Sequence, residues 1–176
     1  LAVVLIVSLS ICGGYFAGKG KSSSYNSGGK APETELASRP EDDSELSENY
    51  SAVFEKVNKS VVSILVYSTE TQTITGSVSG VIYSDDGYIV TNDHVYEDTP
   101  NAQFMVRLYS GEEYKASFVA GDTRSDLAVI KLNDKVKGLE AAVFGNSDEV
   151  IVGDPVITVG YPFSYGSSAT VSHGII

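Results

Sequence analysis

The chain has 176 residues, which is room for one ordinary domain and an added segment. Its formal net charge is −11 and it holds only 12 lysines and arginines, so we expect no nucleic-acid partner, because phosphate backbones are bound by clustered basic side chains. A single cysteine, Cys12, excludes a disulfide framework and a cysteine-based metal site.

Residues 1–18 carry no charge and open on a purely apolar run, Leu1–Val7. An uncharged stretch of this length is at the lower limit for a membrane span. We therefore predict a transmembrane anchor over 1–18, with the following residues outside the cytoplasm. A cleaved signal peptide and a lipid anchor on Cys12 are the alternatives. A signal peptide needs a small-x-small cleavage site, and none is clear here. A lipid anchor needs a small residue just before the cysteine, where this chain has Ile11.

Residues 19–49 form a polar stretch that begins with serines and glycines and continues as an acidic run with two prolines. Gly/Ser-rich sequence makes a flexible linker, and a segment with few apolar residues and many like charges cannot offset the entropy cost of ordering. The composition therefore predicts a disordered linker over 19–49.

From Tyr50 the pattern becomes that of a folded domain. Apolar residues at helical spacing predict a short helix over 51–57, with Ser51 as a candidate N-cap. The remainder is rich in β-branched residues and turn signals. Asp86-Gly87 is a strong hairpin signal, and a second hairpin is expected around the turn 110–112. The expected strands are 61–67, 80–83, 88–91, 104–109, 114–120, 127–132, 156–160 and 169–176. Short strands separated by turns indicate an all-β barrel or sandwich.

The chemistry-bearing candidates are two histidines and the aspartates near strand ends. His94 follows the predicted strand 88–91, whereas His173 lies within the last one and is given no role. A histidine base in acyl transfer needs a carboxylate that fixes its tautomer and stabilises its cation. Asp122 and Asp126 both lie near a strand, and Asp126 directly precedes 127–132. The residues alone leave the choice of partner open.

Several segments in order resemble one family. Residues 86–95 read DGYIVTNDHV, 125–131 read SDLAVIK, and 145–163 contain GNSD, VGDPV and GYPF. Together they resemble the HtrA/DegP family of trypsin-like serine proteases, and the resemblance covers about 50–176. The layout of anchor, linker and protease resembles the membrane-anchored members of Gram-positive bacteria. Asp93 fills a variable position beside the histidine and is expected to influence it only weakly.

The resemblance implies a chymotrypsin-like double β-barrel, with the first barrel and the start of the second present in 50–176. It implies His94 as general base and Asp126 as its orienting carboxylate, with no metal and no organic cofactor. The family's nucleophile lies in a GNSGG motif. Ser147 matches the first three letters, but Asp148-Glu149 replace the glycines whose backbone freedom the oxyanion hole needs.

We therefore reject Ser147 as nucleophile and expect the true serine beyond Ile176. The chain starts at Leu1 rather than Met and ends within a strand-like pattern, which we interpret as an N-terminal part of a longer protein, inactive by itself. The resemblance implies a serine endopeptidase for extracytoplasmic protein quality control that degrades unfolded or misfolded proteins, in a family that commonly forms homotrimers. The alternative is a pseudoprotease, a catalytically dead binding protein on the same fold. A β-sandwich adhesion module would require the order of the motifs to be chance.

Overall fold

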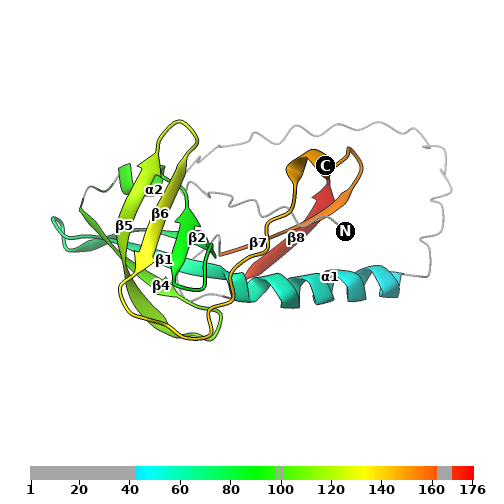
Figure 1. Ribbon diagram of the computed structural model, residues 1–176, viewed down its shortest axis with the longest axis horizontal. Coiled ribbons are helices and arrows are strands. Elements are labelled where there is room, and N and C mark those ends of the chain that lie inside the picture. The colour runs from blue at the N-terminus through cyan, green and yellow to red at the C-terminus, as the bar shows by residue number, and fades with distance from the viewer. Residues whose placement is uncertain (1–42, 98, 100, 162–167) are drawn as a thin grey trace, which may run out of the picture.

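The computed structural model describes residues 43–97, 99, 101–161 and 168–176, with their side chains from Tyr50 onward except that of Glu97 (Figure 1). The predicted anchor and the linker up to residue 42 lie outside the described residues. Among the residues that are described, no helix is long and apolar enough to cross a membrane.

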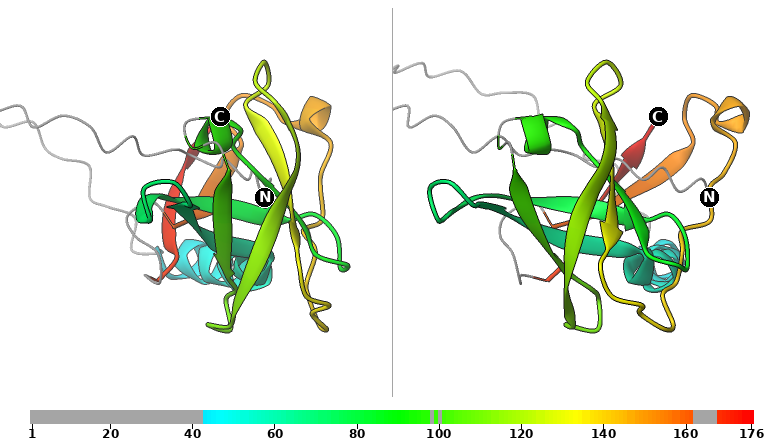
Figure 2. Two further views of the ribbon diagram at one scale, coloured as in Figure 1. Left: turned by 90° about the vertical axis from the view of Figure 1, so that its left-hand side faces the viewer. Right: turned by 60° about the vertical axis from the view of Figure 1, so that its left-hand side comes forward.

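Six antiparallel strands form a closed barrel. In the right-hand view of Figure 2 it lies to the left of the orange and red strands near the C-terminus. The strand order around the barrel is β1-β2-β3-β6-β5-β4. The strands are β1 (Val61–Ser68), β2 (Thr73–Ile82), β3 (Tyr88–Thr91), β4 (Ala102–Arg107), β5 (Glu113–Asp122) and β6 (Leu127–Leu132). The predicted all-β barrel is therefore confirmed, and closure leaves this sheet without an exposed edge.

Both predicted hairpins are present. Strands β2 and β3 pair through Val81–Val90 and Ile82–Ile89, and the turn between them contains Gly87 at a φ of 99°, a conformation that favours glycine. Strands β4 and β5 pair around the second predicted turn. Strand β2 starts at Thr73, earlier than predicted, because its mostly exposed first half still pairs with β1 and obtains its backbone hydrogen bonds there.

The barrel core is filled by apolar side chains, most of them β-branched, that point inward from all six strands. Alternation along each strand puts one face inside, as the period of two requires. The buried cluster consists of Val62, Ile64, Val66, Ile82, Ile89, Phe104, Val106, Ala116, Ile130 and Leu132. Strand β1 is buried on nearly every residue because its other face is also covered, by the elements described next.

A second, smaller core joins the barrel to helix α1 (Asp43–Val57) and to a two-stranded sheet of β7 (Pro155–Gly160) and β8 (Thr170–Ile175). Figure 1 shows α1 lying along this pair. The buried members are Val61, Ile157, Val159 and Tyr161, and Val53, Phe54 and Val57 of α1 pack against them. Ser79 Oγ of β2 also accepts a 2.8 Å hydrogen bond from the Tyr161 amide, which fastens the end of β7 to the barrel.

Two expectations about the N-terminal part are corrected by α1. The predicted helix 51–57 begins at Asp43 instead, so residues 43–49 of the predicted disordered linker are helical and Ser51 is not the N-cap. Acidic residues in the first helical turns are favoured by the helix dipole, and Glu and Leu are good helix formers. Packing of the later turns on β7 stabilises the helix and lets it extend backward into the acidic run.

Candidate active site

His94 and Asp126 are 32 residues apart in the chain, and the pairing of β3 with β6 brings them together. The antiparallel register places Thr91, the last residue of β3, opposite Ala128 near the start of β6. Residues that follow β3 therefore meet residues that precede β6. The buried Thr91 side chain donates a 2.9 Å hydrogen bond to the carbonyl of Ser79, which anchors this end of β3 to β2.

The two side chains make a close, two-pronged contact. His94 Nδ1 lies 2.7 Å from Asp126 Oδ1 and 2.9 Å from Oδ2, and the His94 amide donates to Oδ1 at 3.0 Å. An ionised carboxylate only accepts hydrogen bonds, so Nδ1 carries a proton in this pair. In the neutral ring the other nitrogen, Nε2, is then the acceptor. The hydrogen bond expected for this pair is present.

The remaining ring nitrogen, His94 Nε2, is buried and has no hydrogen-bond partner among the described residues. A buried polar atom without a partner is costly, and such atoms in folded proteins call for an explanation. This one is a basic lone pair held at a fixed place by the contact of Nδ1 with Asp126. The arrangement is that of a base ready to take a proton from an O–H group.

Asp126 is held in an unusual backbone conformation at this site. Its φ is 54°, in the left-handed region that few non-glycine residues adopt. Burial alone would raise the pKa of its carboxyl, but hydrogen bonds from the His94 amide, the His94 ring and Asn92 keep that pKa below its usual value. The carboxylate is therefore ionised near neutral pH, and its side chain is 43% exposed.

The other candidate carboxylate has a structural role. Asp122 accepts hydrogen bonds from the Arg124 amide at 3.2 Å and from Ser125 Oγ at 2.9 Å. These bonds close the turn between β5 and β6, so the side chain is engaged locally. Of the two aspartates that the sequence left open, Asp126 is the one in contact with His94.

The serine and the second histidine lie elsewhere. Ser147 is an exposed residue of the single turn η2 (Ser147–Glu149), and both views of Figure 2 place this turn well away from α2 (His94–Glu97). His173 is exposed on β8, where its ring stacks on Tyr50 of α1 with centroids 5.2 Å apart. Neither residue is brought to the His94–Asp126 pair.

Two residues beside His94 take part in the site. The motif around His94 indicated no role for Asn92 and only a weak influence of Asp93 on the histidine. Asn92 donates from Nδ2 to Asp126 Oδ2 at 2.9 Å. Asp93 is only 5% exposed and accepts a 2.9 Å hydrogen bond from Thr123 Oγ1. In the sequence, only their position next to His94 pointed to a role in the site. Their hydrogen-bond partners, Asp126 and Thr123, come from the loop before β6, which is distant in the sequence.

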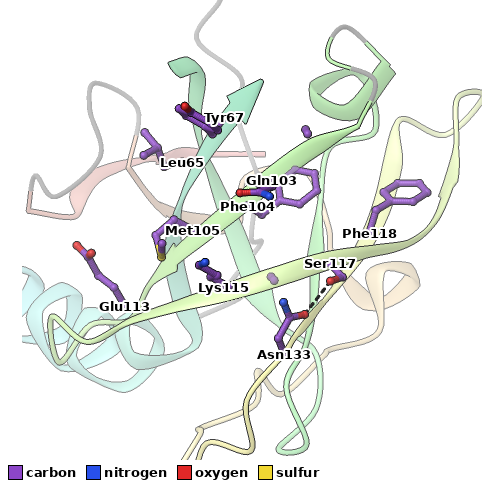
Figure 3. A pocket seen from close by; sticks show the side chains of 12 residues that line it. Leu65, Tyr67, Gln103, Phe104, Met105, Glu113, Lys115, Ser117, Phe118 and Asn133 are labelled. Atoms are coloured by element: carbon purple, nitrogen blue, oxygen red, sulfur yellow. Dashed lines mark hydrogen bonds between the residues drawn. The ribbon is translucent and has the colours of Figure 1, made fainter. Parts of the chain in front are cut away.

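An open groove of about 440 Å³ lies on the outer face of β1, β4 and β5 (Figure 3). Leu65, Tyr67, Met105 and Lys115 are among its lining residues, and Ser117 is hydrogen-bonded to Asn133 at its far end. Neither residue of the His–Asp pair lines this groove. In the part of the chain that the structure describes, no group of three or more His, Cys, Asp or Glu side chains is arranged to hold a metal ion.

A closed six-stranded barrel with a histidine and an aspartate paired at one end of adjacent strands defines the class of trypsin-like peptidases. The chain belongs to the family of trypsin-like peptidase domains, whose model matches residues 78–176.

Its relatives are of the HtrA/DegP type. Over 98 residues it is 47% identical to a probable periplasmic serine endoprotease, DegP-like, of Chlamydia pneumoniae, and 42% identical to the protein of the same description from Brucella suis. Each match covers 56% of this chain, but only 19% and 18% of the relatives, so the chain spans less than a fifth of their length. It is also similar to the solved HtrA-type protease AlgW with a tripeptide, with a TM-score of 0.61, 34% identity, and coverage of 72% of this chain and 39% of that one. The family resemblance read from the motifs is thus confirmed.

Proposed function

We propose that this chain contributes the general base and the orienting carboxylate of an HtrA/DegP-type serine endopeptidase. The observation that carries the proposal is the His94 ring, whose Nδ1 is bound by Asp126 while its buried Nε2 has no partner among the described residues. Acyl transfer by a Ser-His-Asp triad needs this arrangement, with Nε2 directed at the serine hydroxyl.

In each half of the proposed reaction, His94 Nε2 accepts one proton and then gives it up again. The serine oxygen attacks the peptide carbonyl while its proton moves to His94 Nε2, and Asp126 stabilises the resulting imidazolium. The imidazolium then protonates the leaving amine, and an acyl-enzyme remains. In the second half a water molecule attacks the acyl group and gives its proton to Nε2, and the imidazolium then returns a proton to the serine oxygen as the carboxylic acid is released. No step needs a metal or an organic cofactor.

We assign the nucleophile to residues C-terminal of Ile176, in a second barrel whose first strands are β7 and β8. The small share of the relatives that this chain spans supports this assignment. So does the exposure of large apolar side chains on the sheet, where Ile175 is 73% and Val171 is 40% exposed. Residues 1–176 are then inactive by themselves.

The proposed setting is the outer face of a membrane. The DegP-like relatives are named periplasmic, and the uncharged run 1–18 is the proposed anchor that keeps the protease domain extracytoplasmic. By the same kinship, the proposed substrates are unfolded or misfolded proteins, and the proposed assembly is a homotrimer. Digestion of residues 19–42 by an external protease in intact cells would support this orientation, and their protection until lysis would contradict it.

A serine-directed phosphonate tests the proposed activity in the full-length protein. Labelling is expected at one serine downstream of Ile176, and His94→Ala should abolish it. His173→Ala is the matched control, because it removes the other histidine without touching the pair, and it should label normally. A folded full-length protein that does not label would be a pseudoprotease. Labelling and peptide cleavage that survive His94→Ala would overturn the assignment of the base.

A further inference from the structure

The Asn92 side chain binds the carboxylate oxygen of Asp126 that the histidine amide does not bind. Its Nδ2 lies 2.9 Å from Asp126 Oδ2 and 3.3 Å from the Asp126 carbonyl oxygen. The His94 amide holds the other oxygen, Oδ1, at 3.0 Å. Both carboxylate oxygens therefore have a donor besides the His94 ring, which lies within hydrogen-bond distance of each.

The carboxylate decides which way the Asn92 amide is turned. An ionised carboxylate only accepts hydrogen bonds, so the NH₂ group must face it and the amide oxygen must face away. That oxygen, Asn92 Oδ1, is buried and has no hydrogen-bond partner in the described part of the chain. A buried oxygen without a hydrogen-bond partner costs free energy. The amide keeps this orientation only if the hydrogen bond from Asn92 Nδ2 to the Asp126 carboxylate contributes more than that cost.

Asp126 needs such support because its backbone conformation is uncommon and its carboxylate is partly exposed to water. The residue has a φ of 54°, and its side chain is 43% exposed, so water competes for its oxygens. Its carbonyl is held by Asn92 Nδ2 and by the Asp93 amide, each at 3.3 Å. Rotation of the carboxylate would break the bonds on both oxygens together.

We propose that Asn92 is a positioning residue, whose amide fixes the plane of the Asp126 carboxylate and thereby keeps the proton of His94 on Nδ1 and Nε2 free as the base. The catalytic meaning of this role rests on the proposed function, but the geometry it describes does not. Asn92 touches neither substrate nor the reacting serine, and acts only through Asp126.

The first test measures the geometry without any activity. The chain has only two histidines, so nitrogen-15 NMR of the detergent-solubilised 176-residue chain separates the His94 ring from the exposed His173 ring, which serves as an internal reference. In Asn92→Ala the Nδ1 proton of His94 should exchange with water about ten-fold or more faster, and the pKa of Asp126 should rise toward the usual aspartate value, since the Asn92 bond helps to lower it.

The matched control is Asn146→Ala. Asn146 is an exposed asparagine whose side chain accepts a hydrogen bond from the Asp148 amide in η2. Its replacement should leave the exchange rate of the His94 Nδ1 proton and the titration of Asp126 unchanged. Asp86 supplies a second reference, because its pKa is lowered by Lys131 and not by Asn92. An Asn92→Ala chain with unchanged Nδ1 exchange and unchanged Asp126 titration would overturn the proposal.

The second test uses kinetics of the full-length protein. Asn92→Ala should lower kcat on the order of 10²-fold with KM unchanged, as expected when a catalytic group is misplaced by about 1 Å. Asn92→Asp has the same shape but replaces a donor by a repelling charge, so it should be worse than Ala. If Asn92 were needed only for packing, Asn92→Ala would lower kcat more than Asn92→Asp, because Asp keeps the shape of the side chain. That result would refute the positioning role.

The two tests separate this proposal from the proposed function. If wild-type full-length protein has no peptidase activity while Asn92→Ala still frees the His94 ring in the NMR experiment, the enzyme assignment fails and the positioning role stands. If the wild type is active and both Asn92 variants equal it, the positioning role fails and the enzyme assignment stands.

Discussion

Gly121 of β5 has no room for a side chain, because the buried carboxyl group of Asp93 occupies the space. A Cβ atom added at Gly121 would overlap Asp93 Oδ1, and would lie 2.8 Å from Asp93 Cγ and 3.2 Å from Phe118 Cζ. The backbone of Gly121 is not in the left-handed region, so alanine fits its φ. Gly121→Ala therefore isolates the steric conflict with the residue next to His94.

The expected cost follows from what the Asp93 carboxylate loses when it turns away. It accepts a 2.9 Å hydrogen bond from Thr123 Oγ1, and a bond to a charged group contributes about 1.5–3 kcal/mol. Alanine restricts the unfolded chain and offsets about 0.4–1 kcal/mol of this. We expect Gly121→Ala to lower the free energy of unfolding by about 1–2 kcal/mol. In an Asp93→Ala background the overlap is gone, and the same change should cost about zero.

Urea denaturation of the wild type, the two single variants and the double variant measures this coupling. The chain has no tryptophan, so far-UV circular dichroism is the suitable signal, and midpoints are compared at constant m. A coupling of about 1–2 kcal/mol between Gly121→Ala and Asp93→Ala is expected, as for residues in contact. An equal cost of Gly121→Ala in both backgrounds would refute the reasoning, since the Asp93 carboxyl would then not be what excludes the side chain.

Four further predictions concern activity and stability. Asp126→Asn should lower the turnover of the full-length enzyme about 10⁴-fold, as the same change does in the best-studied triad, because an amide leaves His94 in the wrong tautomer. A loss below about ten-fold would exclude Asp126 as the partner of His94. Residues 1–176 alone should cleave no unfolded protein in a gel assay, and cleavage that disappears on His94→Ala would mean that they contain the nucleophile. Gly80→Ala should cost about 1–3 kcal/mol in a urea titration, since its Cβ would lie 2.6 Å from Ile64 Cδ1 in the barrel core, and a neutral result would mean that the core can yield there. The hydrogen bond from Lys131 lowers the pKa of Asp86 in the folded protein, so this bond stabilises the fold above the usual aspartate pKa of 3.8, and the stabilisation is lost as the pH falls through the lower folded pKa. The urea midpoint should therefore fall in acid more for the wild type than for Lys131→Met. Plots of midpoint against pH that run parallel for the two proteins would contradict this.

The strands, the hairpins and the family could be read from the sequence because they rest on local information. Alternating or continuous apolar runs between turn residues placed 61–67, 88–91 and 127–132 within one residue of β1, β3 and β6. A pattern with a period of two reports which face of a strand is buried, and it does so without any knowledge of the partner strands. The motif around His94 is equally local, since it occupies the end of one strand and the loop that follows.

The start of α1 and the membership of the site were decided by the tertiary structure. Helix α1 extends to Asp43 because its later turns pack on β7, a segment about one hundred residues further along the chain, which composition cannot reveal. The choice of Asp126 over Asp122, and the hydrogen bond from Asn92, both follow from the register of β3 with β6, which places the loop after one strand against the loop before the other. Local pattern determined which segments become strands, and only their pairing across the closed barrel determined which polar groups meet, because hydrogen-bond geometry depends on neighbours in space.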